Sequence, residues 1–180
     1  MRILPLLLSK RGPVRTGGLL GIVLAVAASI AWSRAPEARI KLGGAWVPQV
    51  DNGTRGLVTY GATDPSGLSA VFRAQMVWPP EMLASMGLDA ITDEIGEEFV
   101  TGRDTSQYTG IWYGLTGGRI ALIFLDNTTI THLSPTQLSL EHTIDIYWAS
   151  DDTDHDGYPD PGKTPFTTVT AKSVSKRVGH

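Results

Sequence analysis

The sequence predicts an all-β fold, either a small antiparallel barrel or a sandwich, with one short helix and an N-terminal apolar export helix. Apolar and polar side chains alternate with a period of two along two long segments, as they do in half-buried antiparallel strands. Turn sequences rich in glycine, proline, aspartate and asparagine separate the apolar segments, which favours short hairpin connections. We therefore expect residues 36–180 to form a single β-rich domain, preceded by an export segment at residues 1–35.

The export segment begins with basic residues and continues with sixteen uncharged residues, 17–32 (GGLLGIVLAVAASIAW). This order is typical of a secretory signal peptide, and the small residues Ser33 and Ala35 suit cleavage. The alternative is a retained N-terminal membrane anchor, although sixteen residues fall short of the roughly 20 that span a bilayer as a helix. Both alternatives place the domain outside the cytoplasm, either secreted or held at a membrane only through residues 17–32.

Charge and composition exclude several classes of protein. Residues 1–35 carry five basic side chains and no acidic one, whereas residues 36–180 hold ten basic and eighteen acidic side chains. A domain this acidic is not expected to bind nucleic acid, because phosphate contacts need lysine and arginine. The chain has no cysteine, which excludes disulfides, thiol nucleophiles and iron–sulfur clusters.

Five segments show the clearest strand character. Residues 68–78 and 138–148 alternate, with mostly apolar side chains at the even positions. Residues 120–125 (IALIFL) are apolar on both faces, which suits a central strand. Residues 108–113 and 166–174 are rich in threonine, valine and aromatic side chains, as strands are. Seven or eight short strands joined by hairpins imply a small barrel or a sandwich.

One segment departs from this alternation. Prolines at positions 79 and 80 end a strand, and the helix-forming residues 81–86 (EMLASM) precede Gly87, which favours a short helix near residues 80–87. The acidic segment 89–103 fits either an extension of this helix or a strand that ends at Val100. A solvated polar face is the expected role of its acidic side chains, with paired carboxylates for acid–base chemistry as the alternative: Asp93, Glu94, Glu97 and Glu98.

The predicted domain opens with Gly44-Ala45-Trp46, which resembles the G-x-W signature of lipocalin-like barrels. In that family the tryptophan closes the bottom of an eight-stranded up-and-down barrel from the first strand. The resemblance rests on this strand, because we do not find the family's second motif, a Thr-Asp-Tyr-like turn followed by a basic residue. The fold alternative is an NTF2-like cone, a curved antiparallel sheet, but that family normally opens with long helices.

The segment 151–163 (DDTDHDGYPDPGK), which we name the aspartate loop, resembles the D-x-D-x-D-G loops of EF-hands, dockerins and thrombospondin type 3 repeats. Those loops bind Ca²⁺, which takes six to eight oxygen ligands at about 2.3–2.6 Å. Acidic side chains two residues apart converge in a tightly wound loop, and Gly157 allows the sharp turn. The predicted metal ligands are Asp152, Asp154, Asp156, the Tyr158 carbonyl oxygen and Asp160.

The aspartate loop is not an EF-hand. Lys163 stands where an EF-hand has its bidentate glutamate, and Pro159 and Pro161 prevent an exiting helix. Without that glutamate, we expect a weak site with a dissociation constant of the order of 10⁻⁴–10⁻³ M, unless Asp151 supplies the missing oxygen. The alternative is an acidic surface turn without an ion, although closely spaced carboxylates repel one another unless a cation neutralises them.

The combined prediction is an exported lipocalin-like β domain that binds a small apolar ligand and is stabilised by Ca²⁺. Its cavity is expected to be lined by Phe72, Met76, Trp112, Leu140, His142 and Ile146. One alternative is an extracellular structural or interaction module without a small-molecule ligand, and a second is an NTF2-like enzyme that transfers protons through His142 and a carboxylate. A cavity of about 300 Å³ or more around His142 would favour binding or catalysis, whereas a packed interior would favour the structural module.

No catalytic residue is assigned from sequence motifs. The chain contains no G-x-S-x-G, no H-E-x-x-H and no phosphate-binding loop. The sequence does not decide whether His132 and His142 lie on the same face of the sheet. They do so only if the turn at residues 134–136 has an odd number of loop residues.

Overall fold

The computed structural model describes residues 42–50, 54–63 and 65–179, all of which belong to one compact unit. The predicted export segment at residues 1–35 lies outside the described residues, so its cleavage or retention stays a prediction. Within the described part of the chain, no helix has both the length and the apolar character needed to span a membrane.

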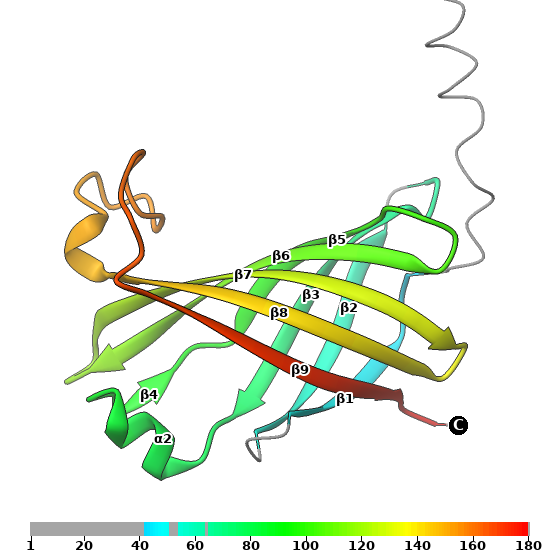
Figure 1. The fold of residues 1–180 in the computed structure, drawn as a ribbon, viewed down its shortest axis with the longest axis horizontal. Coiled ribbons are helices and arrows are strands. Elements are labelled where there is room, and N and C mark those ends of the chain that lie inside the picture. Colours follow the sequence, from blue (N-terminus) through cyan, green and yellow to red (C-terminus); the bar gives the residue numbers. More distant parts are fainter. Residues whose placement is uncertain (1–41, 51–53, 64, 180) are drawn as a thin grey trace, which may run out of the picture. The chain divides into compact units, whose positions relative to one another are not determined.

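Eight antiparallel strands form a closed barrel, so the barrel is the correct alternative and neither the sandwich nor the NTF2-like cone is formed. These strands are β1 (Ala45–Val50), β2 (Arg55–Thr63), β3 (Ser69–Val77), β5 (Glu94–Val100), β6 (Thr105–Thr116), β7 (Arg119–Ser134), β8 (Gln137–Trp148) and β9 (Thr167–Arg177). Each barrel strand pairs with the next one, and β9 pairs with β1 to complete the ring (Figure 1). A two-residue strand, β4 (Ala90–Ile91), pairs with β6 outside the ring.

The first and last strands meet beside the tryptophan of the G-x-W sequence. Trp46 lies opposite Arg177 in the β1–β9 pairing, and its indole nitrogen donates to the Gly43 carbonyl oxygen at 3.1 Å. The Arg177 guanidinium lies over the Trp46 ring, 5.8 Å from the ring centroid, which is a cation–π distance. Sequence reasoning missed this basic residue because a contact between the two ends of a domain leaves no local pattern.

The alternation of the strands determines which side chains fill the barrel. In β6, for example, the even-numbered residues from Ser106 to Gly114 are buried, whereas the odd-numbered ones face outward. One group of buried apolar side chains lies around the first strand: Trp46, Phe72, Ala74, Tyr108, Ile130, Leu138 and Leu140. A second group lies beside the short helix: Leu88, Trp112, Leu122, Phe124 and Ile146.

The short helix predicted near residues 80–87 is confirmed as α2 (Pro80–Ser85), which lies between β3 and β4. It ends as expected at Gly87, whose φ of 70° is accessible to glycine at little cost, while the Leu88 amide donates to the Leu83 carbonyl oxygen at 3.0 Å. The acidic segment 89–103 forms β4 and β5, so the strand alternative was correct and its predicted end at Val100 is confirmed.

Gly96 allows a close approach between β5, β6 and the ring of Phe72. A Cβ atom at position 96 would lie 2.1 Å from the Thr109 carbonyl oxygen and 2.7 Å from the Phe72 ring. Because the first of these atoms belongs to the backbone, a side chain at this position would force the two strands apart.

Candidate ligand cavity and acidic loop

A cavity of about 120 Å³ lies inside the barrel beside α2. Its walls are mostly apolar and include the two methionines of the helix segment, Met82 and Met86. Three aromatic and five polar side chains also line it: Trp78, Trp112, Phe124, Thr54, Thr92, Glu94, Asp126 and His142. This volume is below the roughly 300 Å³ of a typical ligand pocket, and is closer to a cavity of about 150 Å³ that binds benzene.

The six predicted ligand-binding residues divide between two cavities. Four of them line the 120 Å³ cavity: Met76, Trp112, His142 and Ile146. Phe72 and Leu140 instead line a smaller cavity of about 50 Å³, which shares Met76, His142 and Glu94 with the first. Sequence reasoning missed Trp78, Phe124, Asp126 and Glu94, although the first lies on the same alternating face as Met76.

A polar network between the two cavities is centred on Asp126. Its carboxylate accepts hydrogen bonds from the hydroxyls of Tyr108 and Thr128, each at 2.8 Å, and lies 2.9 Å from Nδ1 of His142. The other ring nitrogen of His142, Nε2, lies 2.9 Å from the Ser173 hydroxyl. Burial raises the pKa of Tyr108, and the nearby charges of Glu94 and Asp126 raise it further, so this phenol remains a donor.

Ser173, His142 and Asp126 are the residue types of a hydrolytic triad, but their surroundings do not suit acyl transfer. The Ser173 hydroxyl lies at the 50 Å³ cavity, which is too small for an acyl group and its leaving group. Ser173 also lies within paired strands, opposite Leu140 and next to β1. We therefore interpret the chain of hydrogen bonds as the satisfaction of buried polar groups.

His132 and His142 both face the barrel interior. The loop between β7 and β8 has two residues, which alone would put the histidines on opposite faces. A register shift between His132 and Ser134 adds one residue to β7, and this bulge restores a common face. Near His132, the fully buried Glu98 accepts hydrogen bonds from Tyr60 and Ser106, so the histidines belong to two separate polar clusters.

The prediction that the acidic segment presents a solvated face is wrong for Glu94 and Glu98. Both side chains point into the barrel, and they are 6% and 0% exposed. Asp93 does remain at the surface, where it pairs with Arg73. The period of two explains this division, because β5 starts at Glu94 and residues 94, 96 and 98 take the inward positions. Sequence reasoning failed here because carboxylates are rarely buried without a positive partner.

Glu94 is an unsatisfied polar group of the cavity. Its Oε1 atom is buried and has no hydrogen-bond partner among the described residues. Burial raises the pKa of Glu94 well above its ordinary value, and the charge of Asp126 raises it further, which favours the protonated carboxyl. Gly110 makes room for this side chain, since a Cβ atom there would lie 2.2 Å from Oε1.

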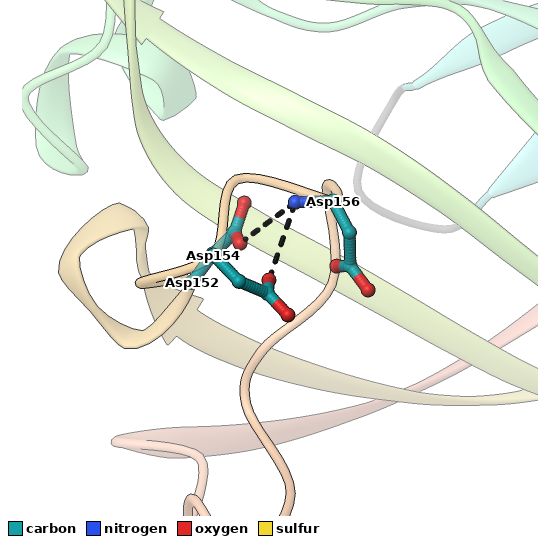
Figure 2. A group of neighbouring side chains, drawn as sticks. All are labelled: Asp152, Asp154 and Asp156. Carbon is teal, nitrogen blue, oxygen red and sulfur yellow. Dashed lines mark hydrogen bonds between the residues drawn. The ribbon is translucent and has the colours of Figure 1, made fainter.

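The aspartate loop brings three of its predicted ligands together. Asp152, Asp154 and Asp156 each place a carboxylate oxygen within 4.8 Å of the others (Figure 2). The Asp156 amide donates to carboxylate oxygens of both Asp152 and Asp154, at 3.2 and 3.3 Å, and this winds the loop around the cluster. Gly157 has a φ of 95°, as expected for the sharp turn.

Two other acidic side chains of the loop make contacts outside this cluster. The Asp160 carboxylate accepts hydrogen bonds from the amide and hydroxyl of Thr153, at 3.1 and 2.6 Å, and these bonds lower its pKa. Asp151 lies 3.2 Å from the ammonium of Lys163 and is paired with that side chain in this structure. The Tyr158 amide donates to the Asp156 carboxylate at 2.8 Å.

The aspartate loop is attached to the outer wall of the barrel. The Tyr113 hydroxyl on β6 donates to the Gly157 carbonyl oxygen at 3.2 Å. Burial raises the pKa of Tyr113, followed by the charges of Tyr158, Asp152 and Asp156, so the loop carboxylates act on the barrel wall.

The fold and the cavity define a class, a closed eight-stranded antiparallel β-barrel with an apolar cavity above a buried polar network.

No protein-family model matches the chain, and no curated protein is significantly similar to it. The solved structures that are similar to it include two with low sequence identity. The structure of EF1p2_mFAP2b bound to DFHBI is 21% identical with a TM-score of 0.47, and covers 81% of this chain and 98% of its own. A redesigned beta barrel, b11L5F_LGL, is 13% identical with a TM-score of 0.45, and covers 80% of this chain and 100% of its own.

Proposed function

We propose that the chain is an extracytoplasmic β-barrel protein that binds a small, largely apolar molecule in the cavity beside α2. The observation that carries the proposal is an apolar, aromatic-lined cavity with a few polar groups on one side, which is the general character of small-molecule sites. Its volume of about 120 Å³ suits a molecule of about one ring. Met76, Met82 and Met86 line the cavity, and their unbranched side chains adapt readily to a guest.

Toluene is expected to bind the protein and raise its melting temperature, because the cavity walls are apolar. Replacing Ala171, which lines the cavity, with leucine fills the space and is expected to abolish this rise. The matched control is Thr170→Leu, since Thr170 is the preceding residue on β9 and is exposed. Calorimetric melting with and without toluene tests this. An unchanged melting temperature of the wild type, or an equal rise in A171L, contradicts the proposal.

A structural or interaction module without a ligand is the second candidate. The small volume of the cavity favours it, because most of the interior is filled by side chains. The toluene experiment separates the two candidates, because a filled barrel would not respond to toluene.

We also propose that the aspartate loop binds Ca²⁺ through Asp152, Asp154 and Asp156, and that the Tyr158 carbonyl oxygen and Asp160 complete the site. The proposal is supported by the convergence of three carboxylates in a loop with the D-x-D-x-D-G spacing. Because the loop is hydrogen-bonded to Tyr113 on β6, binding of the ion would stabilise the barrel as well.

Calcium is expected to stabilise the EDTA-treated protein by about 1.4 kcal/mol when its concentration is ten times the dissociation constant. This corresponds to a rise in melting temperature of roughly 3–6 °C for a domain of this size. Asp154→Ala is expected to lose the rise, whereas Asp104→Asn, which changes an exposed acid outside the loop, is expected to keep it. Differential scanning calorimetry in EDTA and in about 10 mM Ca²⁺ measures both, and equal rises in all three proteins would contradict a site in the loop.

A further inference from the structure

Three residues that line one cavity each carry a buried polar atom without a partner among the described residues. These atoms are Oε1 of Glu94 and the indole nitrogens of Trp78 and Trp112. Buried polar groups are nearly always hydrogen-bonded, so three unpaired atoms around a single cavity of about 120 Å³ indicate that a polar group of a guest belongs there. The grouping of these unpaired polar atoms around one cavity is a separate observation from the apolar walls that support ligand binding.

The three atoms differ in what they require. An indole nitrogen can only donate a hydrogen bond, so Trp78 and Trp112 need an acceptor. The Glu94 carboxyl can accept a hydrogen bond from a hydroxyl or an N–H group, and its protonated form can also donate. A single group that both donates and accepts satisfies Glu94 and at least one indole, whereas an ammonium group satisfies no indole.

The charge of the cavity also favours an uncharged guest. Asp126 already accepts from two hydroxyls and lies against His142, so its carboxylate is fully engaged. Burial and the charge of Asp126 raise the pKa of Glu94, and a protonated carboxyl adds no negative charge that would attract a cation. No lysine or arginine lines the cavity among the described residues, and His142, which does, already lies against Asp126, so an anionic guest would have no free counterion.

We propose that the guest is an uncharged molecule of about one ring that carries one hydroxyl or amide group, which binds Glu94 and an indole N–H of Trp78 or Trp112. This inference rests on the proposed ligand-binding function and specifies the chemistry of its ligand. Hydrogen bonds of this kind contribute individually modest amounts, and two of them are expected to raise the affinity about tenfold or more over an apolar molecule of the same shape.

Two pairs of probes of nearly equal size test the inference by calorimetry. Phenol is expected to bind at least about tenfold more tightly than toluene, because it differs only in having a hydroxyl in place of the methyl group. Cyclohexanol is expected to bind more tightly than cyclohexylamine, which is a cation at neutral pH. Equal affinities for phenol and toluene, as when a water molecule satisfies the three atoms, would overturn the inference, and so would a preference for cyclohexylamine. If toluene itself fails to bind, the proposed function fails instead.

Variants test whether the Glu94 carboxyl and an indole N–H group cause the preference for phenol over toluene. Glu94→Met is expected to reduce the ratio of phenol to toluene affinity to about one, whereas Glu94→Gln, which still donates and accepts, is expected to retain most of it. Trp112→Phe removes an N–H group and is expected to lower the ratio even if Glu94→Met does not fold. The matched control is Glu97→Met on the outer face of β5, which is expected to keep the wild-type ratio. A wild-type ratio in both Glu94→Met and Trp112→Phe would contradict the assignment.

Discussion

Phe124→Ala is expected to lower the free energy of unfolding by about 3–5 kcal/mol, which is a large part of the stability of a single domain. Phe124 is 1% exposed, and its ring stacks on Trp112 with the centroids 5.2 Å apart and the planes at 5°. It also lies 6.4 Å from the Trp78 ring, so its removal would enlarge the cavity and unpack two tryptophans. Guanidinium denaturation followed by tryptophan fluorescence measures the loss.

The control for this variant is Ile120→Ala on the same strand. Ile120 is 48% exposed, so its truncation is expected to cost only about 0.5 kcal/mol. Similar losses for Phe124→Ala and Ile120→Ala would contradict the packing described for the second core group.

Asp126→Ala is expected to destabilise the barrel by about 3–5 kcal/mol, because it leaves several buried groups without their acceptor. Asp126 is 2% exposed, and the hydroxyls of Tyr108 and Thr128 both donate to it. His142 loses one of its Nδ1 partners at the same time and keeps only the hydroxyls of Thr128 and Tyr108 near this nitrogen. The loss is measured by chemical denaturation at neutral pH.

Asn127→Ala provides the matched control for Asp126→Ala. Asn127 is the next residue on β7 and is exposed, so a loss of about 0.5 kcal/mol or less is expected. A loss below about 1 kcal/mol for Asp126→Ala would show that the network contributes little to stability, and would contradict its interpretation as a set of mutually satisfied buried groups.

Most of the strands could be predicted from the sequence because they depend on local patterns, although none of the predicted segments covered β2. The alternation at residues 68–78 and 138–148 anticipated β3 and β8 almost to the residue, and the prolines and Gly87 anticipated α2. The closure of the barrel could not be predicted, because the pairing of Trp46 with Arg177 joins the two ends of the domain. Barrel and sandwich have the same local alternation, and only this long-range pairing distinguishes them.

The candidate site was predicted only in part. His142 could be placed inside the barrel because it lies on the same alternating face of β8 as the apolar residues. The face on which His132 lies depends on a bulge in β7, and no turn motif in the sequence predicts that bulge. Glu94 was missed because the burial of a carboxylate depends on its surroundings, here the space above Gly110 and the apolar walls of the cavity. The aspartate loop was easier to identify, since all of its acidic residues lie within one short segment.

The pairing of β9 with β1 also bears on how the protein avoids aggregation. Each of the eight barrel strands has a neighbour on both sides along part of its length, and there its backbone amides and carbonyls are occupied within the molecule. Apolar side chains such as Val71 and Ile95 lie on the outside of these strands and are 50% and 56% exposed. A second copy could contact them through side chains, but it could not extend the sheet as in an amyloid from these doubly paired segments without first opening the ring.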